Sequence, residues 1–262
     1  MRIVRFKDKT KAVRYGIMEG DVVTAAEGDP LQGLKPGSSS VALHEVKLLA
    51  PIQPPNVLCL GENYKAHVEE GGGKLPKAPI LFMKATTAVI GPDEPVVIPK
   101  MASANVDYEA ELALVIGKTA RHVPESRALE YVLGYTCAHD VSARDAQRND
   151  GQWVRGKSFE TFCPLGPWIE TDLDPANLRV QGRLNGQTMQ DATTALMIFN
   201  IPFLISYLSR GMTLLPGTVL LTGTPSGVGF ARKPPVWLKP GDVFEVEVEG
   251  IGVLRNPIVE EK

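Results

Sequence analysis

The chain has 262 residues, enough for one large domain or for a large domain with a small appendage. Hydrophobic residues make up 44% and charged residues 22%, which is typical of a soluble globular protein and excludes a disordered acidic regulator. The 28 Lys and Arg against 30 Asp and Glu give a net charge of −2. Nucleic-acid binders usually have a basic surplus, so we expect no nucleic-acid partner.

Cysteine content and apolar runs bear on the compartment. The three cysteines form no C-x-x-C pair, so we expect neither a disulfide scaffold nor a zinc module. The first ten residues lack the apolar run of a signal peptide. The most apolar stretch, 196–208, contains Asn200 and Pro202 and is shorter than the ~20 residues that cross a bilayer. These features predict a cytoplasmic protein with free, buried thiols and no membrane partner.

The first fifty residues predict a small N-terminal β domain. Three segments, RIVRF, VRYGIM and VVTA, are typical of short strands. Residues 28–40 predict a loop, because Gly, Pro and Ser dominate them. Three prolines within residues 50–57 suit a stiff linker. We therefore assign residues 1–50 to this domain and residues 51–262 to a larger one.

Strands are expected to dominate the larger domain, with a few short helices between them. The apolar patterns predict strands at 80–83, 106–116, 132–138, 219–221 and 243–248, and helices at 64–70, 124–131, 142–148 and 195–208. Asn63 and Ser142 are the expected N-caps of two of these helices. The Asn185-Gly186 pair between alternating segments predicts a hairpin.

The segment NVDYEAELALVIG at 105–117 has the most informative pattern. On a strand, Asp107, Glu109 and Glu111 share one face, and the opposite face is apolar throughout. Two carboxylates about 7 Å apart on such a face can share one hard cation such as Mg²⁺. The other interpretation is an exposed acidic strand end.

A third acidic residue follows the next predicted strand. Asp140 lies between an apolar strand and a predicted helix, where a carboxylate either projects into a site or caps the helix. Ser142 can serve as that cap, which leaves Asp140 available for the site.

His67 and Glu70 are three residues apart on a predicted helix and therefore share one face. A carboxylate beside an imidazole makes a general-base pair able to activate water. The glycines at 71–73 predict a hinge after this helix. The alternative is an ordinary surface His–Glu pair.

Lys157 lies among Trp153, Phe159 and Phe162, so its ammonium group can be partly desolvated. A lysine in such a position can hold an enolate or carboxylate oxygen. The alternative is a surface lysine whose stem covers aromatic rings. The segment TGTPSGVGF at 222–230 resembles a phosphate loop, but the prolines that follow exclude the helix such a loop requires.

Six segments in this order resemble the fumarylacetoacetate hydrolase superfamily over residues 56–256. They are CLGENYKAHVEE (59–70), VDYEAELALVIGK (106–118), GYTCAHDVSARD (134–145), GKSFETFCPLGPW (156–168), LNGQTMQ (184–190) and LTGTPSGVG (221–229). The resemblance implies a strand-dominated α+β protein, with a mixed β-sandwich roll of the superfamily's C-terminal type and a small N-terminal β domain. It also implies a homodimer and a Mg²⁺ or Mn²⁺ site.

The same resemblance implies a role for each matching position. The metal ligands would be Glu109, Glu111 and Asp140; the water-activating pair His67 and Glu70; the enolate-stabilising group Lys157; and the substrate-lining residues Gln147 and Thr224. Three positions depart from the superfamily pattern. Glu62 and His139 differ from the residues common in relatives, and Leu60 stands where a fourth carboxylate ligand would fall. The last departure favours the branch with three carboxylates.

Enzymes of that branch act on 2-oxo acids through an enolate. The first expectation is a divalent-metal hydrolase or lyase that cleaves a carbon–carbon bond in β-diketo or 2-oxo acids of the acylpyruvate type. The second is a 2-hydroxyhepta-2,4-diene-1,7-dioate isomerase or decarboxylase of aromatic catabolism. A third, of another class, is a small-molecule binding protein without catalysis.

Overall fold

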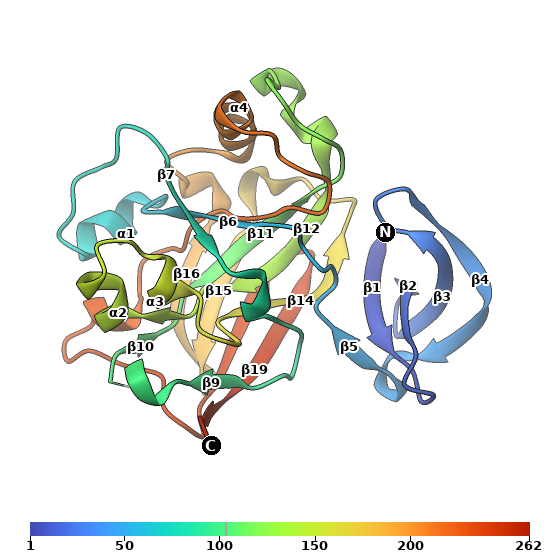
Figure 1. Cartoon of the computed structure of the whole chain (residues 1–262), viewed down its shortest axis with the longest axis horizontal. Helices are drawn as coiled ribbons and strands as arrows, with labels where there is room; N and C mark the ends of the chain where they lie inside the picture. Colours follow the sequence, from blue (N-terminus) through green and yellow to red (C-terminus); the bar gives the residue numbers. More distant parts are fainter. Residues whose placement is uncertain (103) are drawn as a thin grey trace.

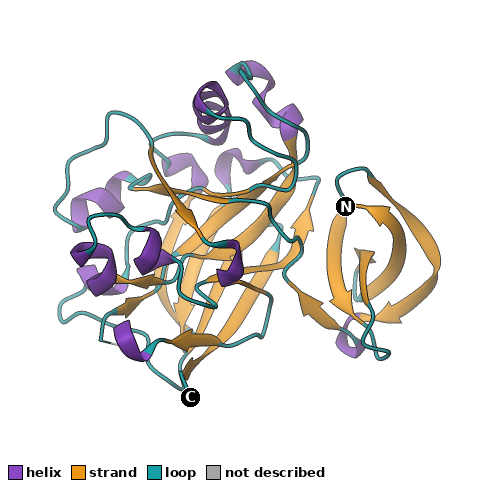
Figure 2. Ribbon diagram, in the orientation of Figure 1, coloured by secondary structure: helices purple, strands orange, loops and turns teal. Residues whose placement is uncertain are grey.

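The computed structural model describes residues 1–102 and 104–262. Strands form most of its regular structure, and short helices lie around them (Figure 2). The strand-dominated α+β class expected from the sequence is confirmed. Among the described residues, no helix is both long and apolar enough to span a membrane.

The elements follow one another along the chain with short connections. The strands are β1 (Arg2–Lys7), β2 (Val13–Glu19), β3 (Val22–Asp29), β4 (Gly33–Ala42), β5 (Lys47–Leu49), β6 (Val57–Gly61), β7 (Ile80–Lys84), β8 (Val89–Ile90), β9 (Val96–Ile98), β10 (Val106–Asp107), β11 (Ala110–Ile116), β12 (Val132–His139), β13 (Ser142–Ala143), β14 (Cys163–Glu170), β15 (Arg179–Leu184), β16 (Gln187–Thr193), β17 (Val219–Leu221), β18 (Val243–Val248) and β19 (Gly252–Glu260). The α-helices are α1 (Lys65–Glu70), α2 (Arg144–Asn149), α3 (Val154–Lys157) and α4 (Ile201–Gly211). The 3₁₀ turns are η1 (Leu43–Glu45), η2 (Thr86–Ala88), η3 (Lys100–Ala102), η4 (Glu125–Tyr131), η5 (Pro175–Asn177), η6 (Thr194–Leu196) and η7 (Gly229–Ala231).

The N-terminal strands β1 to β4 pair antiparallel in chain order and lie to one side of the molecule (Figure 1). They enclose a small apolar cluster of Val4, Phe6, Met18 and Val23. β5 returns to pair with β1, and the start of β1 pairs with the end of β14. Residues 50–56, which follow β5, contain no helix or strand.

The prediction of a loop at 28–40 is wrong, because β4 covers most of this segment. β4 pairs with β3, for example Lys35 with Glu27 and Ser40 with Thr24, and a register shift separates these two stretches. Most β4 side chains are exposed. An exposed strand of this kind lacks the apolar alternation that marks a strand in a sequence.

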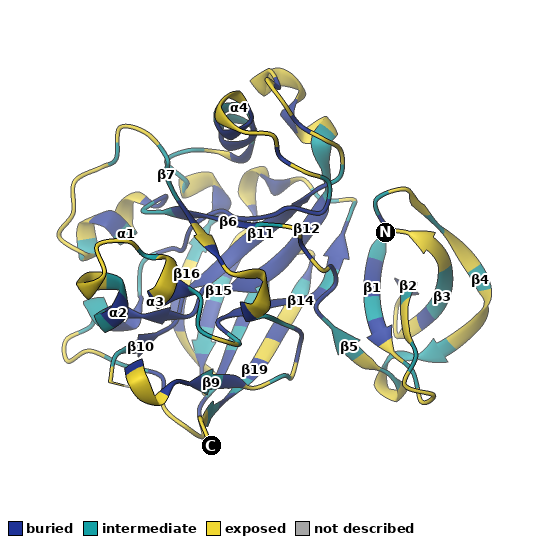
Figure 3. Ribbon diagram, viewed as in Figure 1, coloured by how far each residue is buried: buried dark blue, intermediate teal, exposed yellow. Residues whose placement is uncertain are grey.

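The large sheet continues from β1 through β14, β12, β11, β17, β6 and β7. A second sheet of five strands, in the order β16-β15-β18-β19-β9, lies against it. Leu112 and Leu114 of β11 face the cluster that contains Phe244 and Val246 of β18, whereas Ala113 and Val115 face a second cluster. β11 is therefore buried on both faces (Figure 3).

The hairpin predicted at Asn185-Gly186 is confirmed between β15 and β16. Both turn residues have positive φ, 52° and 79°, as a two-residue turn of the I′ type requires. The helix expected at 195–208 begins later, at Ile201, because the side chain of Asn200 caps it and accepts from the N–H of Phe203 at 2.9 Å. The helix expected at 124–131 is the 3₁₀ turn η4.

Candidate functional site

The carboxylates of Glu109, Glu111 and Asp140 converge where β11 begins and β12 ends. Ala110 is paired with His139, and the N–H of Asp140 donates to the Glu109 carbonyl at 2.9 Å. The three side chains offer oxygens that lie within 4.8 Å of one another. The alternative of an exposed acidic strand end is wrong, because Glu109 is 5% exposed and Glu111 1%.

Asp107 does not join this triad, although the sequence pattern puts it on the same strand face. The predicted strand is broken after Asp107 into β10 and β11, so the alternation does not continue across the break. The Asp107 carboxylate instead accepts from Arg144 Nε at 2.8 Å and from the N–H of Gly229 at 2.7 Å. Asp107 thus fixes Arg144 from outside the triad.

Two buried lysines contact the triad. Lys157 Nζ donates to Glu109 Oε2 at 2.7 Å and to Asp140 Oδ2 at 2.8 Å. Lys84 Nζ donates to Asp140 Oδ1 at 2.5 Å and to the Val141 carbonyl at 3.1 Å. The sequence interpretation missed Lys84. The sequence did contain a signal for it. Lys84 shares a strand face with Phe82 at the end of an apolar segment, where an unpaired charge is costly, so a buried partner could have been expected.

Glu111 lies without a cation in this cluster. Its Oε2 accepts from the N–H of Gly223 at 2.6 Å, and no lysine or arginine in residues 1–102 and 104–262 forms an ion pair with it. Burial and the neighbouring carboxylates of Asp140 and Glu109 raise the pKa of Glu111 well above its ordinary value. The pKa of Glu109 is lowered instead, because Lys157 and Arg144 outweigh its burial.

The contrast between the raised pKa of Glu111 and the lowered pKa of Glu109 bears on whether these residues can hold a metal ion. Three converging carboxylates, of which Glu111 has no paired cation among the described residues, form a hard oxygen donor set that suits a divalent cation such as Mg²⁺ or Mn²⁺. Bound positive charge would relieve the repulsion on Glu111. The donor set therefore fits a divalent ion.

His67 and Glu70 form a close pair on α1. His67 Nδ1 lies 2.9 Å from Glu70 Oε1, and Glu70 Oε2 accepts from the N–H of Gly227 at 2.8 Å. The edge of the His67 ring faces Phe230, with 6.4 Å between ring centres. Both carboxylate oxygens of Glu70 therefore have a hydrogen-bond partner. The contact with Glu70 uses His67 Nδ1 and does not involve Nε2.

The expected helix caps are wrong at both positions. α1 follows Tyr64, and the Asn63 amide instead donates to the carbonyls of Phe199 and Thr222, at 3.0 and 2.7 Å. Ser142 belongs to β13 and donates to the Asp140 carbonyl at 3.0 Å. Both side chains fix backbone beside the site. The contacts of Asn63 join segments far apart in the chain, which local sequence cannot reveal.

Gln147 and Thr224, the expected substrate-lining residues, both reach the same cavity. Gln147 Oε1 accepts from Arg144 at 3.0 Å. Thr224 Oγ1 donates to the Ala110 carbonyl at 2.9 Å and accepts from Gln190 at 2.7 Å. Gln190, buried and not singled out from the sequence, also accepts from the N–H of Ala110 and so ties this loop to β11.

The segment 222–230, which resembles a phosphate loop, binds the protein's own carboxylates. The N–H groups of Gly223, Gly227 and Gly229 donate to Glu111, Glu70 and Asp107 respectively. A Cβ at residue 229 would lie 1.9 Å from the Val236 carbonyl, so only glycine fits there. The backbone N–H groups of this loop therefore serve the site rather than a phosphate.

His139, one of the departures from the superfamily pattern, is buried behind Asp140. Its ring packs on Phe244 with 4.4 Å between centres, and neither ring nitrogen has a hydrogen-bond partner among the described residues. Burial, with Lys84 nearby, lowers the pKa of His139 to about 3. The imidazole is therefore neutral and adds no charge to the triad.

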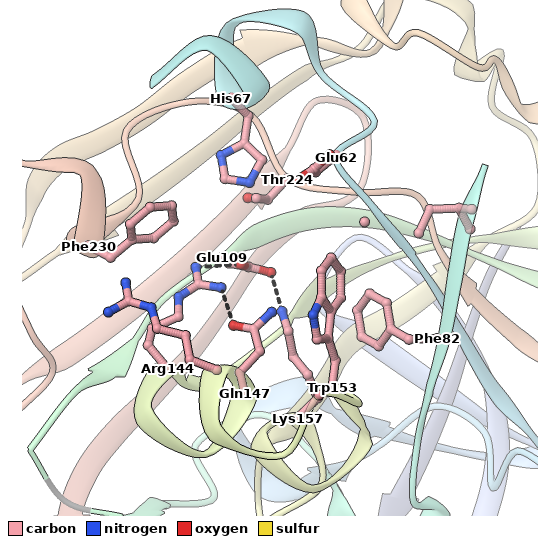
Figure 4. Close-up of a pocket in the computed structure, with 14 residues that line it drawn as sticks. Glu62, His67, Phe82, Glu109, Arg144, Gln147, Trp153, Lys157, Thr224 and Phe230 are labelled. Atoms are coloured by element: carbon pink, nitrogen blue, oxygen red, sulfur yellow. Dashed lines mark hydrogen bonds and ion pairs between the residues drawn. The ribbon is translucent and has the colours of Figure 1, made fainter. Parts of the chain in front are cut away.

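A cavity of about 380 Å³ opens over these groups. Figure 4 shows His67 and Thr224 on one side of Glu109, with Arg144, Gln147 and Lys157 on the other. Phe82, Trp153 and Phe230 supply apolar wall. The cavity thus brings together His67 of the His67–Glu70 pair, Glu109 of the carboxylate cluster, and the fixed cations Arg144 and Lys157.

Comparison with known proteins agrees with this arrangement. Residues 56–259 match the fumarylacetoacetate (FAA) hydrolase C-terminal family, and residues 1–51 match the Rv2993c-like, N-terminal family. The chain belongs to the fumarylacetoacetate hydrolase family, whose members are enzymes. The expected superfamily and its fold are confirmed.

Three relatives span most or all of this chain. Protein Rv2993c of Mycobacterium tuberculosis is 49% identical over 220 residues, 83% of this chain and 80% of the relative. Oxaloacetate tautomerase FAHD2A, mitochondrial, of Homo sapiens is 48% identical over 221 residues, 82% of this chain and 70% of the relative. The crystal structure of 5-carboxymethyl-2-hydroxymuconate delta-isomerase from Mycobacterium smegmatis is 44% identical, with a TM-score of 0.90 over 100% of both chains.

Proposed function

We propose that this protein is a divalent-metal-dependent enzyme that moves a proton at the carbon beside the keto group of a small 2-oxo acid. The observation that supports this most is the shared cavity of His67, Glu109 and Lys157. A base, a carboxylate donor set and a fixed ammonium group are the parts that enolate chemistry needs.

In this proposal Glu109, Glu111 and Asp140 hold Mg²⁺ or Mn²⁺. A bound divalent ion draws electron density from a keto oxygen and so lowers the energy of the enolate. Lys84 and Lys157 keep Asp140 oriented by donating to its two oxygens. Lys157 also provides positive charge at the cavity wall, where it stabilises an oxygen that gains negative charge.

His67 is the proposed proton carrier. Glu70 accepts from Nδ1, which fixes the ring and leaves Nε2 to take a proton from carbon and return it. The hydrogen bond from Gly227 holds Glu70 in place for this role. Gln147 and Thr224 line the cavity and would position the bound acid.

The names of two relatives support proton transfer over bond cleavage. A tautomerase and a delta-isomerase both shift a proton within one molecule. Hydrolysis of an acylpyruvate is the second candidate, favoured by the same His67–Glu70 pair because a base can also activate water. We further propose that residues 1–50 form an accessory domain, that residues 51–262 form the catalytic one, and that the protein is a homodimer.

The test follows enol-oxaloacetate decay by its absorbance, with Mg²⁺, with Mn²⁺ and with a chelator. We expect metal-dependent acceleration and a loss of about 100-fold in kcat for Glu70→Gln, because general base catalysis contributes ~10²–10⁴-fold. Glu69→Gln is the matched control, since Glu69 lies on the same helix with a 61% exposed side chain. No acceleration of oxaloacetate or any other 2-oxo acid with either metal would contradict the proposal.

Acetylpyruvate separates the two candidate reactions. Proton transfer exchanges its C3 hydrogens with deuterium and leaves the carbon chain intact, whereas hydrolysis releases pyruvate and acetate. Both products are followed by NMR in one sample. Release as fast as exchange would favour hydrolysis.

A further inference from the structure

Glu62 places an unpaired carboxylate in the wall of the cavity. It follows β6 directly and lines the same space as His67 and Lys157. Its side chain forms no hydrogen bond or ion pair within residues 1–102 and 104–262, in contrast to Glu70, Glu109 and Glu111. A partly buried charge without a partner is costly, so this carboxylate does not stabilise the fold.

The backbone conformation at Glu62 sets the direction in which its side chain leaves the chain. Glu62 has φ of 55°, a left-handed conformation uncommon for residues other than Gly, Asn and Asp. The neighbouring Asn63 holds it there through its buried hydrogen bonds to residues 199 and 222. Glu62 Oε1 reaches the glycines after α1, where a Cβ on Gly73 would lie 3.7 Å from it.

The opposite wall has the opposite charge. Arg144, Arg148 and Lys157 come from α2 and α3, and Figure 4 shows Arg144 and Lys157 across Glu109 from Glu62. Arg144 and Lys157 are already paired with carboxylates, whereas the exposed Arg148 packs over the Phe230 ring without an ion pair among the described residues. The cavity therefore has one negative side and one positive side.

We propose that Glu62 is a specificity-determining residue for this site, a step that depends on the proposed function. Glu62 disfavours a second carboxylate on its side of the cavity, because like charges repel strongly where water is scarce. It therefore favours acids whose remote end is neutral or donates a hydrogen bond. A second carboxylate has to turn toward Arg148.

The experiment compares two acids of equal chain length, 2-oxohexanoate and 2-oxohexanedioate, which differ in one terminal carboxylate. Exchange of the C3 hydrogens in deuterated Mg²⁺ buffer gives kcat/KM for each. We expect the wild type to prefer the monoacid, and Glu62→Gln to reduce this preference about tenfold by raising the value for the diacid. Glu62→Asp, which keeps the charge, and Glu69→Gln, on the exposed face of α1, should retain the wild-type ratio.

Each outcome decides one of the two proposals. If both acids exchange and Glu62→Gln leaves the ratio within twofold of wild type, the role of Glu62 is overturned and the proposed function stands. The role also fails if the wild type prefers the diacid. If neither acid exchanges, the oxaloacetate assay with Mg²⁺ and Mn²⁺ decides on the proposed function. The ratio of the two dissociation constants, measured by calorimetry in the same buffer, then decides on Glu62. A tenfold shift of that ratio supports its role, and an unchanged ratio overturns it.

Discussion

Two regions of this protein hold ion pairs of nearly equal length. In the N-terminal region, Lys9 Nζ after β1 lies 2.6 Å from Glu45 of η1, with side chains 73% and 36% exposed. Just before β11 begins, Lys157 Nζ lies 2.7 Å from Glu109, with side chains 2% and 6% exposed. Water screens the exposed pair and can solvate either of its partners if the other is removed. Water cannot do this for the buried pair, so each partner depends on the other.

Burial, rather than distance, therefore distinguishes the surface pair from the pair beside the cavity. The buried cluster contains four carboxylates (Asp107, Glu109, Glu111 and Asp140) and three cations (Lys84, Arg144 and Lys157). Glu111 contacts none of these cations. A region that only stabilised the fold would not collect such an excess. The excess is instead what a divalent ion needs.

The largest expected effect comes from removing one buried cation. Lys157→Met should lower the free energy of unfolding of the metal-free protein by about 3–5 kcal/mol, because Glu109 and Asp140 lose a common partner. We also expect a drop in kcat of ~10²–10³-fold. Chemical denaturation and the oxaloacetate assay measure the two effects.

Lys65→Met is the control for this comparison. Lys65 pairs with Glu69 at 3.7 Å, with side chains 66% and 61% exposed, so its loss should leave stability nearly unchanged. Equal destabilisation by both variants would show that burial does not distinguish the two kinds of pair.

A smaller effect should follow from metal binding. A divalent ion at 100 times its dissociation constant should stabilise the native state by about 2.7 kcal/mol, and a chelator should reverse the gain. Glu111→Gln should abolish the metal-dependent rise in Tm while the variant remains folded, because it removes the carboxylate that lacks a cation. A full metal-dependent rise in this variant would contradict the triad as the binding site.

The smallest effect is expected where the N-terminal strands meet the rest of the chain. Glu94 accepts from Lys47 of β5 at 2.8 Å and from the N–H of Gly91 at 2.8 Å. Although burial opposes it, these contacts lower the pKa of Glu94. The stabilisation is therefore present above the ordinary glutamate pKa of about 4.3 and is lost as the pH falls through the lowered value.

Glu94→Gln should thus cost less than about 1 kcal/mol at neutral pH, since solvent screens the pair, and nothing measurable once the pH is well below the lowered pKa of Glu94. Denaturation curves at several pH values measure this difference. Glu27→Gln in β3 is the control, because Glu27 is exposed and has no ion-pair partner among the described residues. A cost that persists in acid would show that the carboxylate charge is not its cause.

Sequence reasoning found the elements that have local signals. The Asn185-Gly186 hairpin needs positive φ at both residues, which this dipeptide provides. The alternation in 110–116 predicted a strand with one apolar face, and the buried strand β11 is there. The acids Glu109, Glu111 and Asp140 were singled out from strand positions, and they lie together in the fold.

What it missed depends on contacts between distant segments. Asn63 looks like a helix cap in the sequence, but its partners are residues 199 and 222. Lys84 lies 56 residues from Asp140 along the chain, and only the fold brings them into contact. The strand break at 108–109 was hidden because Asp107 continues the alternating pattern into a position held by Arg144 and Gly229.

The loop at 222–230 gives three separate carboxylates a common support. Its N–H groups bind Glu111 of the acidic triad, Glu70 of the His67–Glu70 pair and Asp107, which anchors Arg144. A displacement of this one segment would disturb the donor set, the base and the cationic wall together. These three features of the site are therefore coupled through the backbone of one loop.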